Sequence, residues 1–588
     1  MKMKMPPLAI CAESTWRVLA AAAILLLAPL AGRAAGSWQK ITGFPYSNPG
    51  HMLLLPDGRV MVQNSGAFPG NGWYGLTPDD HGHYLNGSWT NLNSMADTRL
   101  FYASQVLRNG KVLVAGGEGG SGGSTAEIYD PIADSWNYTP AAGVGFSDAG
   151  SILLANGEVM VEPVGFYMSS AFYTFLYDPA VNQWYPGPKD LAYQDESTWV
   201  KLPDNSVLSV DIFTGGTTSE RYIPYFNTNT WIPDAPLPVS MAGGKSEVGG
   251  AFMLADGRAF WLGGSGFTAF YTPSGNASNG QWTQGPNMPF YSGPTVFADT
   301  NGNYQATNYT GLLTARDTPA AMMNNGKILC QLAAGALHNQ VWFYEYNPSI
   351  TNFVGAPSPG STTPAAPYLL GSSGSPVASD STSMLDLPDG TVLYNDCVNL
   401  YIYTPDGSPL PVGQPIVIST SWNADGSLHL AGTLFNGISQ GASFGDDAQQ
   451  DSNYPLVRFT SSSGNVTYGR THNWSSTGVQ TGGQIVTTEC KVPASIAGSL
   501  ATYSLQVVAN GNASVPINFQ EPVWVDFNYT VGTEDGTYAR PYDTLAKGTN
   551  TVPSGGTIAI KPGSSPETIT ISKPMNIIAV GGAATVGH

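Results

Sequence analysis

Short apolar runs alternate with glycine-centred turns along the first two thirds of the chain. The pattern first occurs as Leu55-Pro56-Asp57-Gly58-Arg59-Val60 and returns as Leu107-Arg108-Asn109-Gly110-Lys111-Val112. Further copies are centred on Gly157, Asn205, Gly257, Gly326 and Gly390. Asp-Gly and Asn-Gly pairs between apolar runs are typical of β-hairpins whose turns are of the primed type, with positive φ. The pattern therefore predicts seven hairpins built from short strands.

A second motif follows the turns, in which an aromatic strand leads to Asp-Pro or Thr-Pro and then to tryptophan. Examples are Tyr129-Asp130-Pro131 with Trp136, Tyr177-Asp178-Pro179 with Trp184, and Tyr271-Thr272-Pro273 with Trp282. Successive turns are 52, 47, 48, 52, 69 and 64 residues apart. A period of about 50 residues with four strands per unit is typical of kelch-type propeller blades. Residues 36–407 are therefore predicted to form a seven-bladed kelch-type β-propeller, with the tryptophans between blades and insertions near residues 292–316 and 358–378.

The period ends after residue 407, and two further patterns follow. Residues 408–520 contain short alternating strands such as Ile416-Val417-Ile418-Ser419, which favour an immunoglobulin-like β-sandwich. Residues 521–588 contain short strands between Gly and Pro corners, which resemble the first coils of a right-handed parallel β-helix. Since such a solenoid buries its core by stacking coils, this module is expected to carry an exposed edge or to pair with another surface. The predicted fold class is all-β, in three parts.

Composition supports an extracellular β protein. Of the 588 residues 42% are apolar and 11% charged, against about 25% charged in an average soluble domain. The 70 glycines and 44 prolines favour turns over helix interiors. The formal net charge is −18, and no cluster of Lys and Arg occurs, so a nucleic-acid backbone would be repelled. Neutral sugars, cations and basic groups remain as partners.

Residues 1–35 are predicted to be a signal peptide. Lys2, Lys4 and Arg17 precede an apolar run over residues 18–30, and Gly32-Arg33-Ala34 places small residues at the cleavage positions. The run is too short to span a bilayer comfortably, although an uncleaved membrane anchor is the alternative. Because no second such run occurs, the mature protein is expected to be secreted or attached to the cell surface, with no membrane span.

One motif carries a resemblance to a known family. The segment Tyr468-Gly469-Arg470-Thr471-His472-Asn473, followed by residues 507–514, resembles the galactose oxidase-like and glyoxal oxidase-like copper-radical oxidases, which combine a kelch propeller with such a sandwich. The similarity covers residues 38–519. The resemblance implies that the Thr-His pair sends a loop into the propeller axis and that His472 ligates copper there.

The chain departs from this family at the other copper-centre positions. Where the family has a Tyr-His pair before the last blade's turn, this chain has Asp380 and Ser381. Tyr102 is the nearest candidate for the radical tyrosine, and no cysteine lies between Cys11 and Cys330 to form the family's cross-link. A copper radical needs a redox-active tyrosine and nitrogen ligands suited to Cu(II). Copper is therefore disfavoured, and no cofactor is expected.

Charged residues recur about nine or ten positions before the turn residues, or close to these positions. In a propeller such positions lead into the innermost strands, so that residues of different blades converge around the axis at one face. The candidate binding residues, with His472 pointing to the same place, are Arg99, Tyr102, Asp148, Asp195, Glu196, Glu247, Arg316, Asp317, Asp380 and His472.

Three interpretations of this set remain open. The residues could be polar loop groups that satisfy backbone amides, or they could bind a sugar or peptide. They could also be catalytic, or hold a hard cation such as calcium, since clustered carboxylates raise one another's pKa. Gly445-Asp446-Asp447 is a second candidate for calcium, or a simple turn.

The function predicted from the sequence is binding of carbohydrate or of a cell-surface or matrix component, through the axial face and without copper. Two alternatives are kept. One is an enzyme on the same face, either an oxidase with atypical ligands or a carboxylate-based hydrolase. The other is a structural surface protein that self-associates through residues 521–588.

Overall fold

A computed structural model of the chain gives the fold. It describes residues 35–46, 48–147, 149–162, 173–194, 197–224, 230–242, 247–298, 303–335, 339–371, 377–442 and 450–587. Residues 1–34 of the predicted signal peptide, the candidate site residues Asp148, Asp195 and Glu196, and the candidate calcium segment 445–447 lie outside the described residues. Within the described part of the chain, no helix has the length and apolar character of a membrane span.

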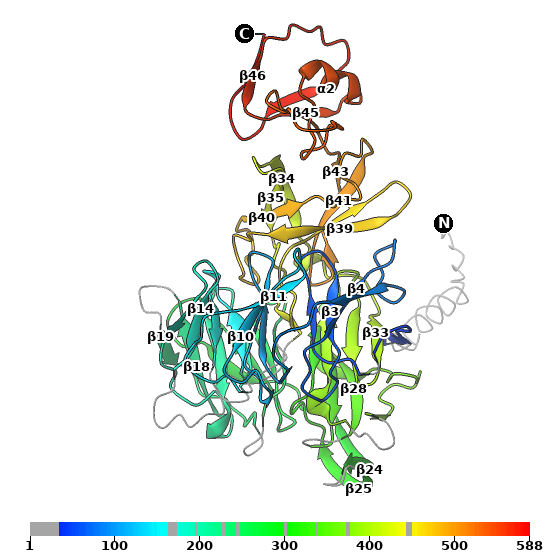
Figure 1. Ribbon diagram of the computed structural model, residues 1–588. Helices are drawn as coiled ribbons and strands as arrows, with labels where there is room; N and C mark the ends of the chain where they lie inside the picture. Colours follow the sequence, from blue (N-terminus) through cyan, green and yellow to red (C-terminus); the bar gives the residue numbers. More distant parts are fainter. Residues whose placement is uncertain are drawn as a thin grey trace, which may run out of the picture.

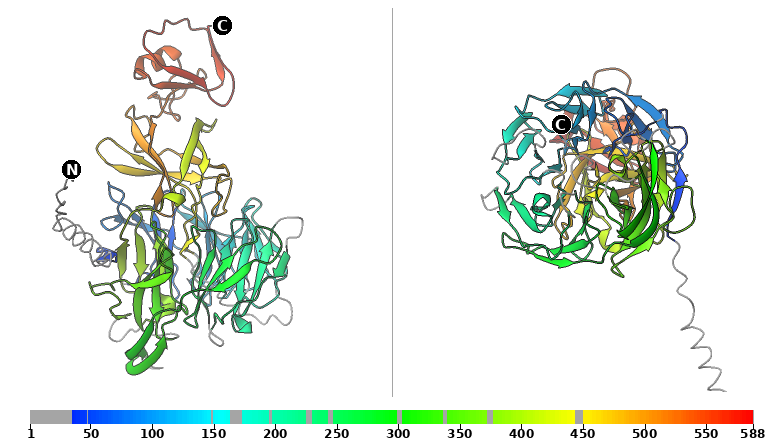
Figure 2. Two further views of the ribbon diagram at one scale, coloured as in Figure 1. Left: turned by 180° about the vertical axis from the view of Figure 1, so that it is seen from behind. Right: turned by 90° about the horizontal axis from the view of Figure 1, so that it is seen from below.

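The described residues form seven four-stranded antiparallel blades around an axis (Figures 1 and 2). Blade 1 contains β2 (Met52–Leu54), β3 (Val60–Gln63), β4 (Trp73–Thr77) and β5 (Ser88–Leu92), and blade 2 contains β7 (Ala103–Val106), β8 (Val112–Ala115), β10 (Ala126–Asp130) and β11 (Ser135–Tyr138). Blade 3 contains β12 (Ser151–Leu153), β13 (Val159–Val161), β14 (Phe175–Asp178) and β15 (Gln183–Pro186), and blade 4 contains β16 (Trp199–Lys201), β17 (Val207–Asp211), β18 (Thr218–Ile223) and β19 (Thr230–Pro233). Blade 5 contains β20 (Ala251–Met253), β21 (Ala259–Leu262), β22 (Thr268–Thr272) and β23 (Gln281–Gln284). Blade 6 contains β26 (Ala320–Met322), β27 (Ile328–Ala333), β28 (Gln340–Asn347) and β29 (Asn352–Gly355). Blade 7 contains β31 (Ser383–Asp386), β32 (Val392–Asn395), β33 (Leu400–Thr404) and β1 (Ser37–Lys40). The predicted fold class, all-β with a seven-bladed propeller, is confirmed.

The ring is closed by pairing the start of the propeller with its end. β1 pairs antiparallel with β33, with Ser37 opposite Thr404 and Lys40 opposite Tyr401. Trp38 packs edge-on against Phe343 of blade 6, with ring centroids 5.0 Å apart, and its indole donates to the Pro357 carbonyl at 2.7 Å. The outer strand of blade 7 therefore comes from the opposite end of the sequence.

The turns between the first and second strands differ from the predicted primed type. In blade 1 the Gly58 N–H donates to the Leu55 carbonyl at 2.9 Å, and Gly58 has φ +80° while Asp57 does not have positive φ. Positive φ at one position indicates a type I turn followed by a left-handed residue, a hairpin class in which the primed geometry is not needed. Asp57 accepts a hydrogen bond from the Arg59 N–H at 3.1 Å. In blade 4 Asn205, with φ +65°, takes the glycine position, which asparagine tolerates better than most residues.

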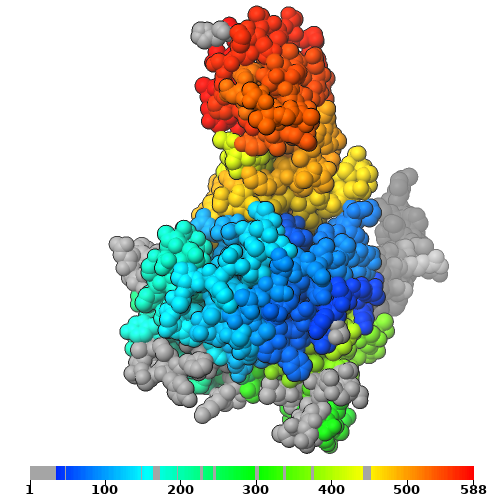
Figure 3. Space-filling view, viewed as in Figure 1, coloured from blue at the N-terminus to red at the C-terminus, as the bar shows by residue number. Residues whose placement is uncertain are grey.

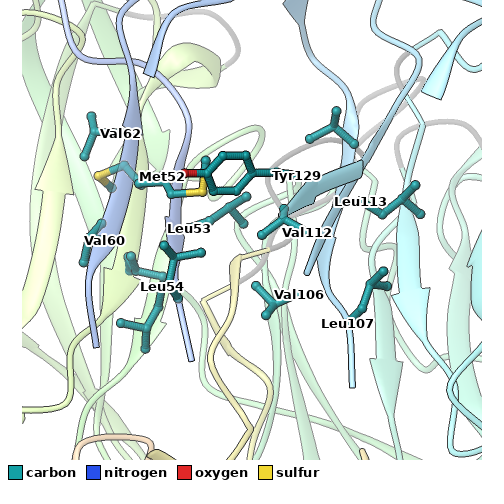
Figure 4. Packing of buried hydrophobic residues seen from close by; sticks show 14 of the residues in the cluster. Met52, Leu53, Leu54, Val60, Val62, Val106, Leu107, Val112, Leu113 and Tyr129 are labelled. Atoms are coloured by element: carbon teal, nitrogen blue, oxygen red, sulfur yellow. The ribbon is translucent and has the colours of Figure 1, made fainter. Parts of the chain in front are cut away.

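The tryptophans of the second motif pack between blades, as predicted. Trp136 pairs with Tyr129 across strands β11 and β10 and stacks on Trp73 of blade 1, with centroids 6.0 Å apart. Apolar side chains of neighbouring blades also face one another, as Leu53 of blade 1 does toward Val106 and Val112 of blade 2 (Figure 4). The core therefore lies between the blades.

Two insertions lie next to blade 6, near the positions 292–316 and 358–378 predicted from the sequence. β24 (Phe290–Ala298) and β25 (Tyr304–Leu312) form a separate two-stranded hairpin, which projects from the end of the propeller opposite the C-terminal parts (Figure 1). β30 (Tyr368–Leu369) adds to β28. A smaller pair, β6 (Arg99–Leu100) with β9 (Gly119–Gly120), lies beside blade 2.

A second antiparallel unit stands on the end of the propeller that carries the turns between the first and second strands of the blades, which we call the turn-bearing end (Figures 1 and 3). Its strands are β34 (Ile416–Trp422), β35 (Leu428–Thr433), β38 (Leu456–Thr460), β39 (Val466–His472), β40 (Val486–Lys491), β41 (Tyr503–Ala509), β42 (Asn512–Ala513) and β43 (Ile517–Phe519). They run in the order β34-β35-β40-β39-β38-β41-β42, with β43 on β41. The sheet wraps a core that includes Leu430, Phe459 and Val507, an arrangement compatible with the predicted sandwich. β36 (Gly441–Ala442) and β37 (Gln450–Asp451) leave this unit to extend blade 6.

The last part of the chain contains parallel strands, an arrangement compatible with the predicted β-helix-like segment. β44 (Val523–Val525), β45 (Thr557–Ile560) and β47 (Asn576–Ala579) form one parallel sheet, and β46 (Gly563–Ser565) and β48 (Ala584–Val586) form another. One helix, α2 (Leu545–Thr551), is capped by the Thr544 hydroxyl, which accepts from the Lys547 N–H. Val523, Val525, Leu545 and Ile558 share a small buried core.

Candidate functional site

The C-terminal unit covers one end of the propeller axis with inserted side chains. Tyr454 and Trp474 stack face to face, with centroids 4.6 Å apart, and both are buried. The Tyr454 hydroxyl donates to the Leu54 carbonyl of blade 1. The Lys201 ammonium of blade 4 donates to the Thr477 carbonyl at 2.7 Å, and Ala442 of β36 pairs with Ala321 of blade 6. The opposite end, which we call the axial face, is where the chain enters the innermost strands.

Four of the candidate residues meet at the axial face. Glu247, Arg316, Asp317 and Asp380 precede the inner strands β20, β26 and β31 of blades 5, 6 and 7, and we call them the axial cluster. The Arg316 Nε lies 3.0 Å from the Glu247 carboxylate and 3.9 Å from that of Asp317. Three carboxylates and one guanidinium are thus gathered from three blades.

The carboxylates of the axial cluster are held in different electrostatic environments. Burial pushes the pKa of Glu247 upward, but hydrogen bonding with Asp317 and Arg316 outweighs burial and lowers this pKa below its ordinary value. Burial raises the pKa of Asp380, and the nearby charge of Glu247 raises it further, against hydrogen bonds from Ser381. Glu247 therefore favours the ionised form, and Asp380 takes up a proton more readily than an exposed aspartate.

A small polar pocket of about 30 Å³ adjoins the cluster, and Asp380 forms part of its wall together with His51, Gln63, Tyr102 and Thr382. The His51 Nε2 lies 2.8 Å from the Ser104 hydroxyl, and the Tyr102 hydroxyl donates to the Gln63 carbonyl oxygen at 3.0 Å. Burial lowers the pKa of His51 to about 3, so that its imidazole is neutral at physiological pH. The pocket has room for a water molecule or a single hydroxyl-sized group.

Two residues of this region hold left-handed backbone conformations. Asp317 of the axial cluster has φ +45°, and Phe101 in the pocket wall has φ +51°. Neither residue is glycine, and such conformations cost free energy and are concentrated at functional sites. Two of the non-glycine residues with positive φ therefore lie in this region.

Exposed aromatic side chains lie in loops at the same end of the propeller as the axial cluster. Phe68 lies between β3 and β4 and Phe213 between β17 and β18, and each loop is at the end opposite the inserted C-terminal residues. Their exposed fractions are 69% for Phe68 and 54% for Phe213, and Phe290 at the base of the β24–β25 hairpin is 66% exposed. Phe213 also packs against Tyr193, with centroids 5.1 Å apart. Flat apolar surfaces are thus exposed at the same end of the propeller as the charged residues.

Tyr102 and Arg99 of the predicted site have different positions. Tyr102 lines the pocket beside Asp380. Arg99, in contrast, is fully buried inside blade 2, where its guanidinium bonds to Glu127 at 2.9 Å and to the Gly116 carbonyl at 2.7 Å. Arg99 is therefore a structural residue of the blade and not a part of the axial cluster.

His472 also lies away from the predicted place. It ends strand β39 and pairs with Glu489 of β40, within the C-terminal unit. Burial lowers its pKa, and the charges of Arg470 and Lys491 lower it further. Because Thr471 and His472 continue the strand, the side chains that enter the propeller come from the following segment, beginning with Trp474. The backbone of β36 pairs with blade 6.

The donor groups that the structure describes at the axial face do not fit a copper-radical centre. Carboxylate oxygens dominate, the described imidazole in the pocket belongs to His51, and His472 lies in another unit. Cu(II) in such centres requires several nitrogen ligands together with a redox-active tyrosine, whereas Tyr102 donates its hydroxyl to Gln63. Among the described residues, no three His, Cys, Asp or Glu side chains are grouped so as to hold a metal ion as they stand. No chemical step is assigned to copper.

Sequence reasoning missed His51 and the exposed aromatic side chains. His51 lies seven positions before Gly58, outside the interval of nine or ten positions that selected the carboxylates. Its place immediately before the inner strand β2 is the signal that would have found it. The aromatic residues lie in irregular loops whose sequence has no period, so their common location depends on the fold.

Comparisons with known proteins give fold similarity alone. No protein-family model matches the chain, and no curated protein matches it. A solved structure described as a fungal alcohol oxidase of the AA5 family in complex with copper is similar, with 14% identity and a TM-score of 0.45, covering 82% of this chain and 99% of the oxidase. A streptogramin B lyase structure is similar with 13% identity and a TM-score of 0.39, covering 64% of this chain and 99% of the lyase. At such identities and TM-scores these similarities assign neither a function nor a site to this β-propeller protein.

Proposed function

We propose that the protein binds a hydroxyl-rich ligand, a carbohydrate, at the axial face of its propeller. The observation that carries this proposal is the convergence of Glu247, Arg316, Asp317 and Asp380 from three blades at the end of the axis opposite the C-terminal unit. The pocket beside Asp380 and the exposed aromatic side chains support it.

Each part of the face suits one part of a sugar. Carboxylates accept hydrogen bonds from hydroxyl groups, and Arg316 donates to hydroxyl or ring oxygens. The pocket accepts one hydroxyl-sized group, with His51 and Asp380 in its wall. Exposed rings such as Phe68 and Phe213 provide apolar faces for the C–H side of a sugar ring. The predicted signal peptide favours binding outside the cell, and the proposal does not involve copper.

A glycan array followed by calorimetry tests the proposal. The purified protein is screened, and the best oligosaccharide is titrated into wild type, Glu247→Gln and Asp380→Asn. Loss of a hydrogen bond to a charged group weakens binding roughly ten- to hundredfold. The control is Asp256→Asn, since this exposed aspartate of blade 5 lies in the turn at the other end. No glycan binding by the wild type, or equal affinities for all variants, would contradict the proposal.

A hydrolase is the second candidate, and the opposite pKa shifts of Glu247 and Asp380 favour it. A pair of carboxyl groups, one ionised and one that holds its proton, is the arrangement needed for base or nucleophile and acid. Release of nitrophenol from aryl glycosides by wild type, absent in both Glu247→Gln and Asp380→Asn and retained in Asp256→Asn, would favour this candidate over binding alone.

A further inference from the structure

Blades 2 and 4 contain the same buried glutamate in the same backbone setting. In blade 2 the carboxylate of Glu127 accepts hydrogen bonds from the N–H groups of Ala96 at 2.8 Å and Asp97 at 3.3 Å. In blade 4 Glu220 accepts them from Leu191 at 2.7 Å and Ala192 at 3.3 Å. Each glutamate lies two residues before the tyrosine that pairs with the inter-blade tryptophan.

The charges around the two glutamates differ. In blade 2 the guanidinium of Arg99, two residues after Asp97, forms an ion pair with Glu127 at 2.9 Å. The corresponding residue of blade 4, two after Ala192, is the neutral Gln194, which donates to Glu220. No permanent positive charge thus stands at the position of Arg99.

Two further positions are acidic in blade 4. In blade 2, Glu127 pairs with Val114 of the neighbouring strand. Gly116, whose carbonyl accepts a hydrogen bond from Arg99, lies two residues after Val114. Asp211 has that place in blade 4, two residues beyond Ser209, the partner of Glu220. Similarly, Met95 directly precedes the two backbone donors in blade 2, and Asp190 precedes them in blade 4. Arg99 fills this position in blade 2. The equivalent position in blade 4 is therefore bordered by three acids, Asp190, Asp211 and Glu220.

These acids are buried, and Asp190 lacks a hydrogen-bond donor among the described residues. Asp190 is 0% exposed, Glu220 1% and Asp211 5%, and Glu162 at the edge of blade 3 is 2% exposed. Neither carboxylate oxygen of Asp190 has a hydrogen-bond donor within the described part of the chain, and this carboxyl lies against Glu162. Lys189 acts on Asp190 through its charge, but the Lys189 side chain is exposed. Burying an uncompensated carboxylate is costly, so the group needs protons or a cation.

We propose that Asp190, Asp211 and Glu220, with Glu162, form a calcium site between blades 3 and 4, at the place where Arg99 lies in blade 2. Calcium takes six to eight oxygen ligands in flexible geometry, which several carboxylates from different loops provide. As the described side chains stand, no three acids surround one point closely enough to coordinate a metal ion, so binding draws Asp190 and Glu162 toward Asp211 and Glu220. Magnesium, which demands near-ideal octahedral geometry at shorter distances, fits this set less well.

Terbium luminescence tests the site, because Trp199 is close to it. The Trp199 indole donates to Gln194 at 3.1 Å, and Gln194 contacts Glu220. Terbium, which replaces calcium, is added to the chelator-treated full chain, and tryptophan is excited. The expected result is sensitised emission that calcium displaces and magnesium does not, and that Asp190→Asn loses.

A second variant separates loss of binding from loss of folding. Gln194→Arg introduces into blade 4 a guanidinium like that of Arg99 in blade 2. In chelator, we expect this variant to have a higher Tm than wild type, and we expect calcium not to raise its Tm. Asp256→Asn, an exposed control, should keep the terbium signal and the rise in Tm with calcium. Absence of any calcium-dependent rise in the Tm of wild type, or an equal rise in Asp190→Asn, would overturn the proposal. Sugar binding at the axial face is a separate property, and its outcome does not bear on this test.

Discussion

At the scale of single residues, buried charge distinguishes one blade from another. Arg99 and Glu127 form an ion pair in which both side chains are almost fully buried, and the backbone carbonyls of Gly116 and Gly122 accept hydrogen bonds from the Arg99 Nη1. An arrangement of this kind is stable only while both partners are present.

Removing the cation alone should therefore destabilise the propeller strongly. Arg99→Met leaves Glu127 buried without its partner, and we expect a loss of about 3–5 kcal/mol in the free energy of unfolding, measured by chemical denaturation. Lys491→Met is the control, because its ion pair with Asp425 is exposed and such pairs contribute about 0–1 kcal/mol. Equal effects of the two substitutions would contradict the structural role of Arg99.

The acids of blade 4 predict how stability depends on pH. Burial chiefly raises the pKa of Asp190 from 3.8 to about 7, and burial with the charge of Asp211 raises that of Glu220 from 4.5 to about 8. Between these values the folded protein holds protons that the unfolded chain has released, so stability falls as pH rises. In chelator, the Tm of wild type should be higher at about pH 5 than at about pH 8. Asp190→Asn should reduce the difference, and a wild-type Tm that rises over this interval would contradict the assignment.

At the scale of elements, the inserted segment after β39 joins the C-terminal unit to the propeller. Trp474 is fully buried, stacks on Tyr454, and its carbonyl accepts from the Arg108 side chain of blade 2 at 2.5 Å. Trp474→Ala should cost about 3–5 kcal/mol, as for other buried aromatic side chains. Denaturation followed by tryptophan fluorescence measures this. The exposed Tyr185→Ala is the control, and a loss no larger than that of the control would show that the stack does not hold the units together.

The elements also show what a sequence can and cannot predict. Turn residues such as Gly58 and Asn205 act locally, and their spacing was enough to predict seven blades. The turn type was wrong, since Asp57 keeps negative φ while Gly58 alone adopts the left-handed conformation. His472 was misplaced because whether a Thr-His pair continues a strand or enters a loop depends on pairing with β40. Long-range partners such as Glu127 for Arg99 carry no signal in local spacing.

The candidate site was predicted in part for a similar reason. Glu247, Arg316, Asp317 and Asp380 were found because propeller symmetry turns an equal sequence offset into a common position. His51 and the aromatic residues Phe68 and Phe213 are not placed by that symmetry, since they belong to irregular loops or fall at another offset.

At the scale of the whole molecule, the two ends of the propeller have different roles. The C-terminal unit and the parallel-strand module stand at the turn-bearing end, while the β24–β25 hairpin projects from the other (Figures 1 and 3). The axial face is therefore left to the propeller itself, with its cluster of three carboxylates and Arg316, its pocket and its exposed aromatic side chains. A ligand bound there would not contact residues 521–588.

Hydrogen exchange with and without the glycan that binds best tests this assignment most directly. The account predicts slower exchange at the segments leading into the inner strands of blades 5, 6 and 7, at residues 247–253, 314–322 and 379–386. Exchange at the turns of the other end, such as residues 55–59, should be unchanged. Protection confined to the C-terminal unit or to those turns, with none at the axial segments, would contradict the account.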